Sequence, residues 1–120
     1  KMSEFNAIET LITQYFKGLH SKNINAVAEV FWSHAEITGY YEGDFVHSKL
    51  HDYLSILKRM SAPNMIGEEF EMHISSIDII GNIASVKTRY VFQALNYVDF
   101  LSLVKIDDVW KIVNKVFYHD

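Results

Sequence analysis

Residues Tyr97–His119 are Y-V-D-F-L-S-L-V-K-I-D-D-V-W-K-I-V-N-K-V-F-Y-H, and this stretch decides the fold. Apolar and polar residues alternate up to Ile106, Asp107-Asp108 interrupt the pattern, and the alternation resumes at Val109. Such a pattern is typical of two antiparallel strands joined by a two-residue turn. The stretch therefore predicts a long β-hairpin.

The register of this hairpin predicts which side chains share a face. Cross-strand partners around a two-residue turn keep a constant index sum. The expected pairs are Ile106 with Val109, Leu103 with Ile112, Leu101 with Asn114, and Asp99 with Val116. One face then carries Asp99 and Asn114 among large apolar side chains, which indicates the wall of a pocket.

Two more strands are expected before the hairpin. Phe70, Met72 and Ile74 share one face and Ile77 and Ile79 the other, which indicates a bulge near Ser75-Ser76. Gly81-Asn82 is typical of a hairpin turn, and the residues from Ala84 to Phe92 alternate again. The expected result is a meander of four long antiparallel strands.

The N-terminal half shows helical spacing instead. A stripe from Phe5 to Leu19 recurs every three or four residues after Ser3, a candidate N-cap. Asn23 is expected to cap a second helix that closes at Trp32-Ser33-His34. A short strand, Glu36–Tyr41, a third helix from Ser48 to Ala62-Pro63 and a loop at Asn64–Gly67 should follow. This order predicts one α+β domain over residues 3–119, with helices on one face of a bent sheet and a cavity at its open end.

Composition narrows the function classes. The 120 residues are 49% hydrophobic and 14% aromatic, with seven Tyr and eight Phe, a surplus that can line a thick core or a ligand cavity. The net charge is -4 and the basic residues are scattered, which disfavours nucleic-acid binding. No apolar run is long enough to cross a membrane, and there is no Cys. We expect a cytoplasmic protein without a cofactor.

The whole chain resembles the nuclear transport factor 2-like superfamily, the cone-shaped α+β barrels also called SnoaL-like or cystatin-like. Its nearest branch is that of the putative lumazine-binding proteins. The resemblance rests on Ile12-x-x-Tyr15-Phe16-x-Gly18-Leu19, Phe31-x-x-His34-Ala35, Gly39-Tyr40-Tyr41-Glu42-Gly43, Tyr53-Leu54 and the closing hairpin from Asp99 to Phe117. It implies three N-terminal helices packed on a strongly bent, mostly antiparallel sheet.

The same resemblance implies roles for single residues. In ketosteroid isomerase, a superfamily member, a tyrosine on the first helix and an acid on a late strand hold the enolate. Tyr15 and Asp99 occupy similar places. The aspartate that moves the proton in that enzyme would fall near Gly39-Tyr40, where no carboxylate stands, and related cyclases often carry histidine where this chain has Asn114. The isomerase mechanism is therefore not supported.

These considerations define the candidate site. Asp99 on an apolar face should have a raised pKa, which a general base or a protonated hydrogen-bond donor requires. Alternatively, Asp99 could lie exposed or be hydrogen-bonded to a tyrosine hydroxyl. Asn114 could contact a ligand or bridge the strands as a core amide. The expected ligand-binding residues are Tyr15, Tyr41, Tyr90, Phe92, Asp99, Leu101 and Asn114, with Asp99 and Tyr15 as catalytic candidates. Tyr53 and Trp110 are assigned to the core.

Two further groups of side chains bear on metal binding and on dimer formation. His47 and His51 have the spacing of a helical metal pair, but no acidic third ligand stands beside them, so no metal site is expected. The other face of the closing hairpin carries Phe100, Val104, Val113 and Phe117, which predicts a homodimer packed sheet to sheet. Three functions stay open: a binder of a small apolar or aromatic molecule, a lyase or isomerase acting by proton transfer, and a non-catalytic dimeric interaction module.

Overall fold

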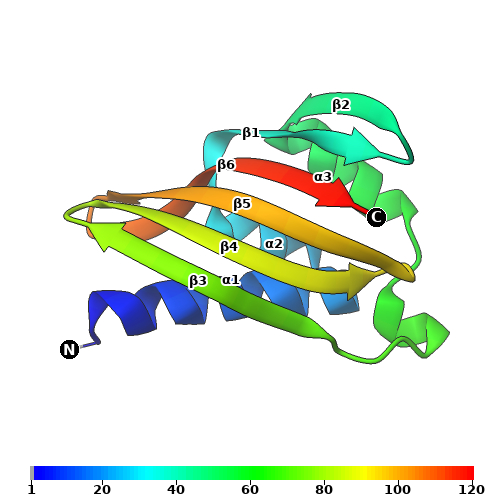
Figure 1. Cartoon of the computed structure of the whole chain (residues 1–120), viewed down its shortest axis with the longest axis horizontal. Helices are drawn as coiled ribbons and strands as arrows, with labels where there is room; N and C mark the ends of the chain where they lie inside the picture. Colours follow the sequence, from blue (N-terminus) through cyan, green and yellow to red (C-terminus); the bar gives the residue numbers. More distant parts are fainter. Residues whose placement is uncertain (1) are drawn as a thin grey trace.

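The computed structural model describes residues 2–120 and folds them into three α-helices, one short 3-10 helix and a six-stranded sheet (Figure 1). The helices are α1 (Glu4–Ser21), α2 (Ile24–Val30), α3 (Leu50–Arg59) and the 3-10 helix η1 (Pro63–Ile66). The strands are β1 (Phe31–Tyr41), β2 (Asp44–Lys49), β3 (Met72–Ile80), β4 (Ile83–Phe92), β5 (Leu95–Ile106) and β6 (Val109–His119).

The two N-terminal helices form as their caps predict. Ser3 Oγ accepts a hydrogen bond from the Asn6 amide, and Asn23 Oδ1 accepts one from the Ala26 amide, so each cap satisfies a backbone N–H at the start of its helix. The apolar stripe of α1 is buried against the sheet: Ile8, Ile12, Tyr15, Phe16 and Leu19. The predicted long amphipathic helix is confirmed.

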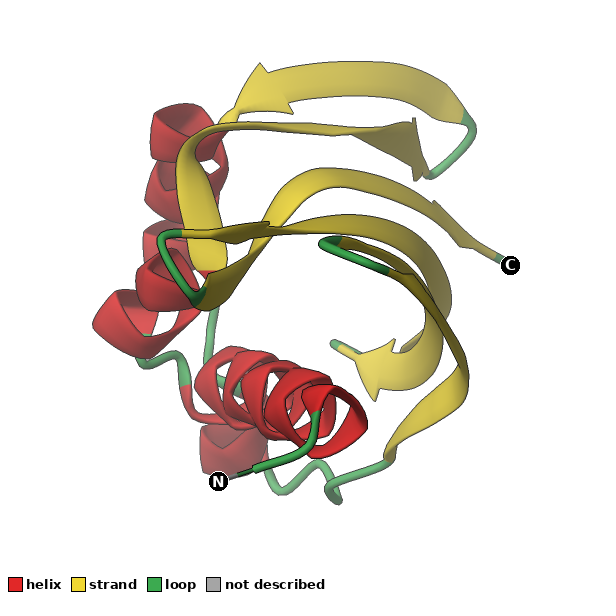
Figure 2. Cartoon of the chain, turned by 90° about the vertical axis from the view of Figure 1, so that its left-hand side faces the viewer, coloured by secondary structure: helices red, strands yellow, loops and turns green. Residues whose placement is uncertain are grey.

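The sheet has the strand order β2-β1-β6-β5-β4-β3. All neighbouring strands are antiparallel except β1 and β6, which are parallel. Figure 2 shows the sheet curling strongly, with α1 on its concave side and the other helices on the same side. The α+β, cystatin-like cone is therefore confirmed, with the core between α1 and the concave face.

The β-turns are confirmed where local chemistry predicts them. Ile106 pairs with Val109 across Asp107-Asp108, and Ile80 pairs with Ile83 across Gly81-Asn82. The bulge of β3 is also confirmed between Ile74 and Ser76. However, it returns Ile77 and Ile79 to the core side that Met72 and Ile74 occupy, so the predicted split between two faces was wrong.

A second bulge, in β6, changes the register of the closing hairpin. Leu103 pairs with Ile112 as predicted, but Ser102 pairs with Asn114, so Val113 is an extra residue on β6. The predicted pairs of Leu101 with Asn114 and of Asp99 with Val116 were wrong, since their partners are Lys115 and Phe117. A one-residue shift moves every following side chain to the other face of the sheet.

The segment between α2 and α3 differs most from the expectation. β1 begins at Phe31, and residues Asp44–Lys49 form β2, which was not predicted. The third helix begins at Leu50 rather than at Ser48, because Ser48 pairs with Ile37 in the β1–β2 ladder. The predicted loop at Asn64–Gly67 is mostly η1. None of the helices within residues 2–120 has the length and apolarity needed to cross a membrane.

Candidate functional site

A cavity of about 680 Å³ opens at one end of the cone, between α3 and the ends of the strands. Its lining comes from nearly every element of the fold: Leu19, Ile37, Tyr41, Phe45, Val46, His47, Ser48, Tyr53, Ile56, Leu57, Arg59, Met60, Tyr90, Phe92, Tyr97, Lys115 and Phe117. Most of these side chains are aromatic or aliphatic. Cavities of this size hold small molecules in many proteins.

Five polar side chains meet at the closed end of this cavity, and we name them the floor cluster: Tyr15, Tyr53, Tyr90, Asp99 and Lys115. The Tyr15 hydroxyl donates to Asp99 Oδ2 at 2.6 Å, and the Tyr90 hydroxyl donates to Asp99 Oδ1 at 3.0 Å. Both carboxylate oxygens therefore have a donor. Asp99 has no exposed surface, so these bonds replace the water it loses on folding.

Lys115 completes the floor cluster. Its Nζ donates to the Tyr53 hydroxyl at 2.9 Å and to the Tyr90 hydroxyl at 3.2 Å, and it lies 3.9 Å from Asp99 Oδ2. Four aromatic rings also lie within 6 Å of the ammonium: Tyr15, Tyr53, Tyr90 and Phe117. The ammonium is thus stabilised by an ion pair, two hydrogen bonds and cation–π contacts.

The surroundings shift the pKa values of Tyr15, Tyr90, Asp99 and Lys115. Burial raises the pKa of Asp99, although the Lys115 charge and the hydrogen bonds from Tyr15 and Tyr90 oppose the rise. Burial acts to lower the pKa of Lys115, but the charge of Asp99 and the interaction with Tyr53 together outweigh burial and raise that pKa. Burial and the Asp99 charge raise the pKa of Tyr15 and of Tyr90 well above the usual tyrosine value. Both tyrosines are therefore neutral hydrogen-bond donors at neutral pH.

Aromatic rings form the wall next to the floor cluster. Tyr90 and Tyr97 stack with their planes 9° apart and their centroids 5.4 Å apart. Tyr97 also contacts Phe117, which faces the cavity because of the β6 bulge. These flat surfaces can accommodate a flat ring.

The sequence matches the family described as "Putative lumazine-binding" over residues 3–118. The chain belongs to this family. A curated relative, "Aldolase FrzH" from Cladobotryum sp, is 28% identical over 118 residues, which is 97% of this chain and 91% of that protein.

Solved structures of low sequence identity share the fold of this putative lumazine-binding family member. A nuclear transport factor 2-like protein of unknown function from Shewanella baltica is 19% identical, with a TM-score of 0.86 over 100% of this chain and 98% of the other. Another, from Silicibacter pomeroyi, is 21% identical, with a TM-score of 0.84 over 99% and 100%. The nuclear transport factor 2-like fold that the sequence predicts is thereby confirmed.

The predicted site residues of this family member fall into four groups. Tyr41, Tyr90 and Phe92 line the cavity, while Tyr15 and Asp99 lie just beneath it in the floor cluster. Leu101 is buried in the core and is not among the lining residues. Asn114 pairs with Ser102, which is exposed, and so lies on the face opposite Asp99; the β6 bulge contradicts the shared face that the sequence predicted.

Sequence reasoning missed Lys115 and Tyr53. Strict alternation from Asn114, which the sequence placed on the inner face, would put Lys115 on the outer face, and Tyr53 was assigned to the core; both side chains line the cavity. The adjacent apolar pair Ile112-Val113 was the signal, since two successive apolar residues interrupt strict alternation and are compatible with a bulge. Trp110 is buried in the core, as expected.

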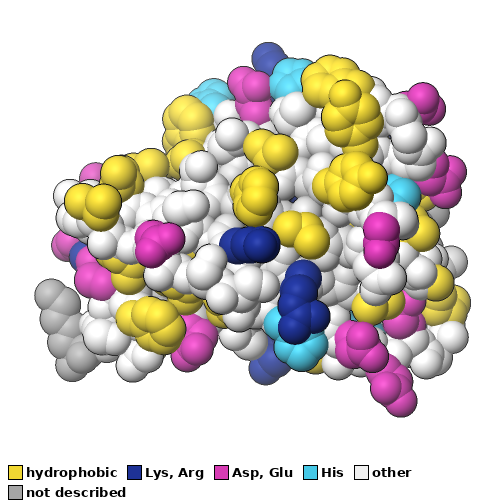
Figure 3. Space-filling model, in the orientation of Figure 1, with side chains coloured by type: hydrophobic (Ala, Val, Ile, Leu, Met, Phe, Trp, Pro, Cys, Tyr) yellow, Lys and Arg dark blue, Asp and Glu magenta, His cyan; other side chains and the backbone are white. Residues whose placement is uncertain are grey.

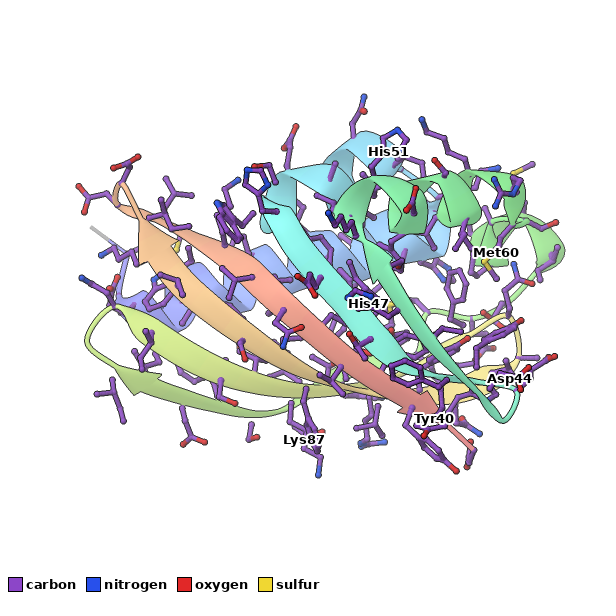
Figure 4. The ribbon with its side chains drawn as sticks, turned by 90° about the horizontal axis from the view of Figure 1, so that it is seen from above. Tyr40, Asp44, His47, His51, Met60 and Lys87 are labelled. Carbon is purple, nitrogen blue, oxygen red and sulfur yellow. The ribbon has the colours of Figure 1, made fainter. Side chains whose placement is uncertain are left out.

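The cavity opening carries residues from β2 and α3. His47 Nε2 lies 2.7 Å from Glu36 Oε1, and Met60 lies at the end of α3, while His51 lies on the exposed side of that helix (Figure 4). His47 and His51 therefore do not form a pair on one helix. No group of three or more His, Cys, Asp or Glu side chains within residues 2–120 is placed to hold a metal ion.

Proposed function

We propose that this protein binds a small, mainly apolar or aromatic molecule in the cavity at the open end of the cone. The observation that carries the proposal is the cavity itself, which combines about 680 Å³ of space, aromatic walls and a single polar floor. Ligand sites typically pair an apolar lining with a few placed polar groups. An interaction module whose cone is filled by its own side chains would leave a cavity smaller than roughly 300 Å³.

The family supports the same proposal. Its description names lumazine, a flat bicyclic heteroaromatic compound, as the ligand class. Such a ring would fit against the stacked pair of Tyr90 and Tyr97, with its polar edge toward the floor cluster. The direct ligand contacts would be Tyr90, Tyr53 and Lys115, with Tyr15 and Asp99 supporting them from below.

The test is a thermal-shift screen with flavin-, pterin-, steroid- and polyketide-like compounds. Binding to the folded state raises the melting temperature, and the stabilisation grows with the logarithm of the ratio of ligand concentration to dissociation constant. Ile56, a half-exposed residue at the cavity opening, allows a matched pair of variants: Ile56→Trp should narrow the opening and weaken binding. His51→Trp, on the exposed side of the same helix, should leave binding unchanged. A screen in which no compound shifts the melting temperature would overturn the proposal.

A second candidate is a lyase or isomerase that acts by proton transfer in the same cavity. The Tyr15–Asp99 hydrogen bond and the raised pKa of Asp99, caused by burial, favour it, as does the relative named an aldolase. Here the Tyr90 hydroxyl, which lines the cavity, would take the proton from a carbon next to a carbonyl group as it passes its own proton to Asp99 Oδ1, so that Asp99 is the final base, and Tyr15 would donate a hydrogen bond to Asp99 Oδ2. Proton NMR in D₂O should then show exchange at that carbon in ketone probes with the wild type and none with Asp99→Asn. Equal exchange in both proteins would exclude this role for Asp99.

The convex face of the sheet supports a further proposal, a homodimer. Phe100, Val116 and Tyr118 are exposed there and Val104 is half-buried. Two residues of the predicted dimer face have other positions: Phe117 faces the cavity and Val113 is the bulge residue. The proposed contact therefore centres on Phe100 and its cross-strand partner Val116. Exposed apolar side chains gathered on one face often mark an interface between protein chains.

A further inference from the structure

The charged side chains that line the cavity are all basic. They are Lys115 at the floor and Arg59 at the opening, and no Asp or Glu is among the lining residues. The chain as a whole has fifteen acidic and eleven basic residues and a net charge of -4. The charged groups that face the cavity are therefore opposite in sign to the net charge of the molecule, which favours an anionic occupant.

Lys115 presents its charge to the cavity while Asp99 does not. Lys115 is 4% exposed and lines the cavity, whereas Asp99 has no exposed surface and lies behind the tyrosines. Both oxygens of Asp99 already accept tyrosine hydrogen bonds. A molecule in the cavity thus meets the ammonium first, and the carboxylate only through the side chains of the floor cluster.

The Lys115 ammonium also has one N–H group that is not used in a hydrogen bond within the floor cluster. A lysine ammonium carries three N–H groups, and those that donate to Tyr53 and Tyr90 account for two. Asp99 Oδ2, at 3.9 Å, is within ion-pair range but beyond hydrogen-bond distance. One N–H of Lys115 is therefore left for a ligand oxygen.

From this arrangement we infer that the ligand is an aromatic molecule with an acidic oxygen group, such as a carboxylate, a sulfonate or an ionised enol, and that Lys115 Nζ binds that oxygen. The inference rests on the proposed function and narrows its ligand class. The aromatic part would lie against Tyr90 and Tyr97, and Arg59 at the opening would attract the anion on its way in.

A pair of fluorescent probes distinguishes binding of any aromatic molecule from binding of an aromatic molecule with an acidic group. Anilinonaphthalenesulfonate and phenylnaphthylamine share their aromatic rings, but only the former carries a sulfonate. Hydrogen bonds to charged groups contribute roughly 1.5–3 kcal/mol, so the wild type should bind the sulfonate probe about 10- to 100-fold more tightly than the neutral probe. Lys115→Met should bring this ratio close to one.

Lys111→Met is the matched control, because it removes the same charge from the same strand. Lys111 donates to the Glu29 carbonyl and is not among the lining residues, so the ratio should stay at the wild-type value. Near-ultraviolet circular dichroism verifies that each variant is folded. Should Lys115→Met fail to fold because it leaves Asp99 unpaired, the double variant Lys115→Met/Asp99→Asn removes both charges and should also give a ratio close to one.

The results test the preference for an anionic ligand separately from the proposed binding function. If the wild type binds both probes with equal affinity, or if the folded Lys115 variant keeps the preference for the sulfonate, the inference is wrong and the proposed binding function stands. If neither probe binds the wild type, the cavity is not a site for aromatic molecules and both proposals fail. Ile56→Trp should weaken both probes alike, which ties the signal to the cavity.

Discussion

Asp99 owes its buried position to three other members of the floor cluster. Its two oxygens accept hydrogen bonds from Tyr15 and Tyr90, and Lys115 supplies the opposite charge. Removing one partner of a buried ion pair typically destabilises a protein by about 3–5 kcal/mol, because the other charge is left uncompensated. The four side chains therefore act as one unit, and a change in any of them should alter the others.

The raised pKa of Asp99 predicts a specific dependence of stability on pH. An aspartate in the unfolded chain has a pKa of about 3.9, and burial raises the pKa in the folded protein. Between these two values the folded state binds more protons than the unfolded state, so the free energy of unfolding falls as the pH rises from about 4 through the folded pKa. Lys115 remains charged in both states over this window and does not contribute to the slope.

Urea titrations of the wild type and Asp99→Asn over this pH range measure the effect. The difference in free energy of unfolding, wild type minus variant, should decrease as the pH rises, because only the wild type carries the titrating group. Asp108→Asn, in the exposed turn between β5 and β6, is the control and should follow the wild-type curve. A pH-independent difference for Asp99→Asn would contradict the raised pKa.

Strand β6 determines which side chains reach the cavity. Its extra residue, Val113, places Lys115 and Phe117 on the concave face and Asn114 and Val116 on the other. The neighbouring strand β1 lies parallel to β6 and pairs Gly39 with Phe117. Gly39 is needed there because a Cβ would lie 2.7 Å from Phe117 Cδ1 and closer still to the Phe117 carbonyl oxygen. The contact of these two strands thus supports one wall of the cavity.

Gly39→Ala should destabilise the protein by about 3 kcal/mol, because the added methyl group meets backbone that cannot move without disrupting the ladder. Urea denaturation measures this change, and ligand or probe binding should weaken with it, since Phe117 lines the cavity. The control is Ser33→Ala, at an exposed position of the same strand, which should stay within about 0.5 kcal/mol of the wild type. Equal stability of the two variants would show that β1 and β6 can separate here.

The curvature of the sheet gives the molecule two unlike faces. The helices cover the concave face and leave the cavity at one end, whereas no helix of residues 2–120 covers the convex face (Figure 2). Figure 3 shows this uncovered side, where hydrophobic side chains lie between charged ones. Phe100 is 58% exposed there, and Lys87, its cross-strand partner, projects from the same face (Figure 4). The face is thus mixed in character, with an apolar centre.

Sedimentation velocity tests the proposed dimer. The wild type should sediment as a dimer at micromolar concentration, and Phe100→Glu should shift it toward the monomer, because a buried unpaired carboxylate at the centre of the contact is unfavourable. His51→Glu adds the same charge on the exposed side of α3, remote from this face, and should leave the dimer intact. A wild-type monomer at these concentrations would remove the homodimer from the proposed function.

Local patterns sufficed to predict the existence of the three α-helices, the turns at Gly81-Asn82 and Asp107-Asp108 and the fold class, but not the start of α3 or the helix η1. The apolar stripe of α1, the caps at Ser3 and Asn23 and the turn at Asp107-Asp108 depend on neighbours within a few residues, so their chemistry can be recognised along the chain. The association of Tyr15 with Asp99 was suggested only by family resemblance, because 84 positions separate them.

The face that each β6 residue presents depended on tertiary packing. A single extra residue reverses every side chain beyond it, and Ile112-Val113 alone does not state where a bulge lies. The pairing of β6 with β5 on one side and with β1 on the other decides this position. For this reason Lys115 faces the cavity and Asn114 faces the opposite side of the sheet. The basic lining of the site could therefore be recognised only in the folded chain.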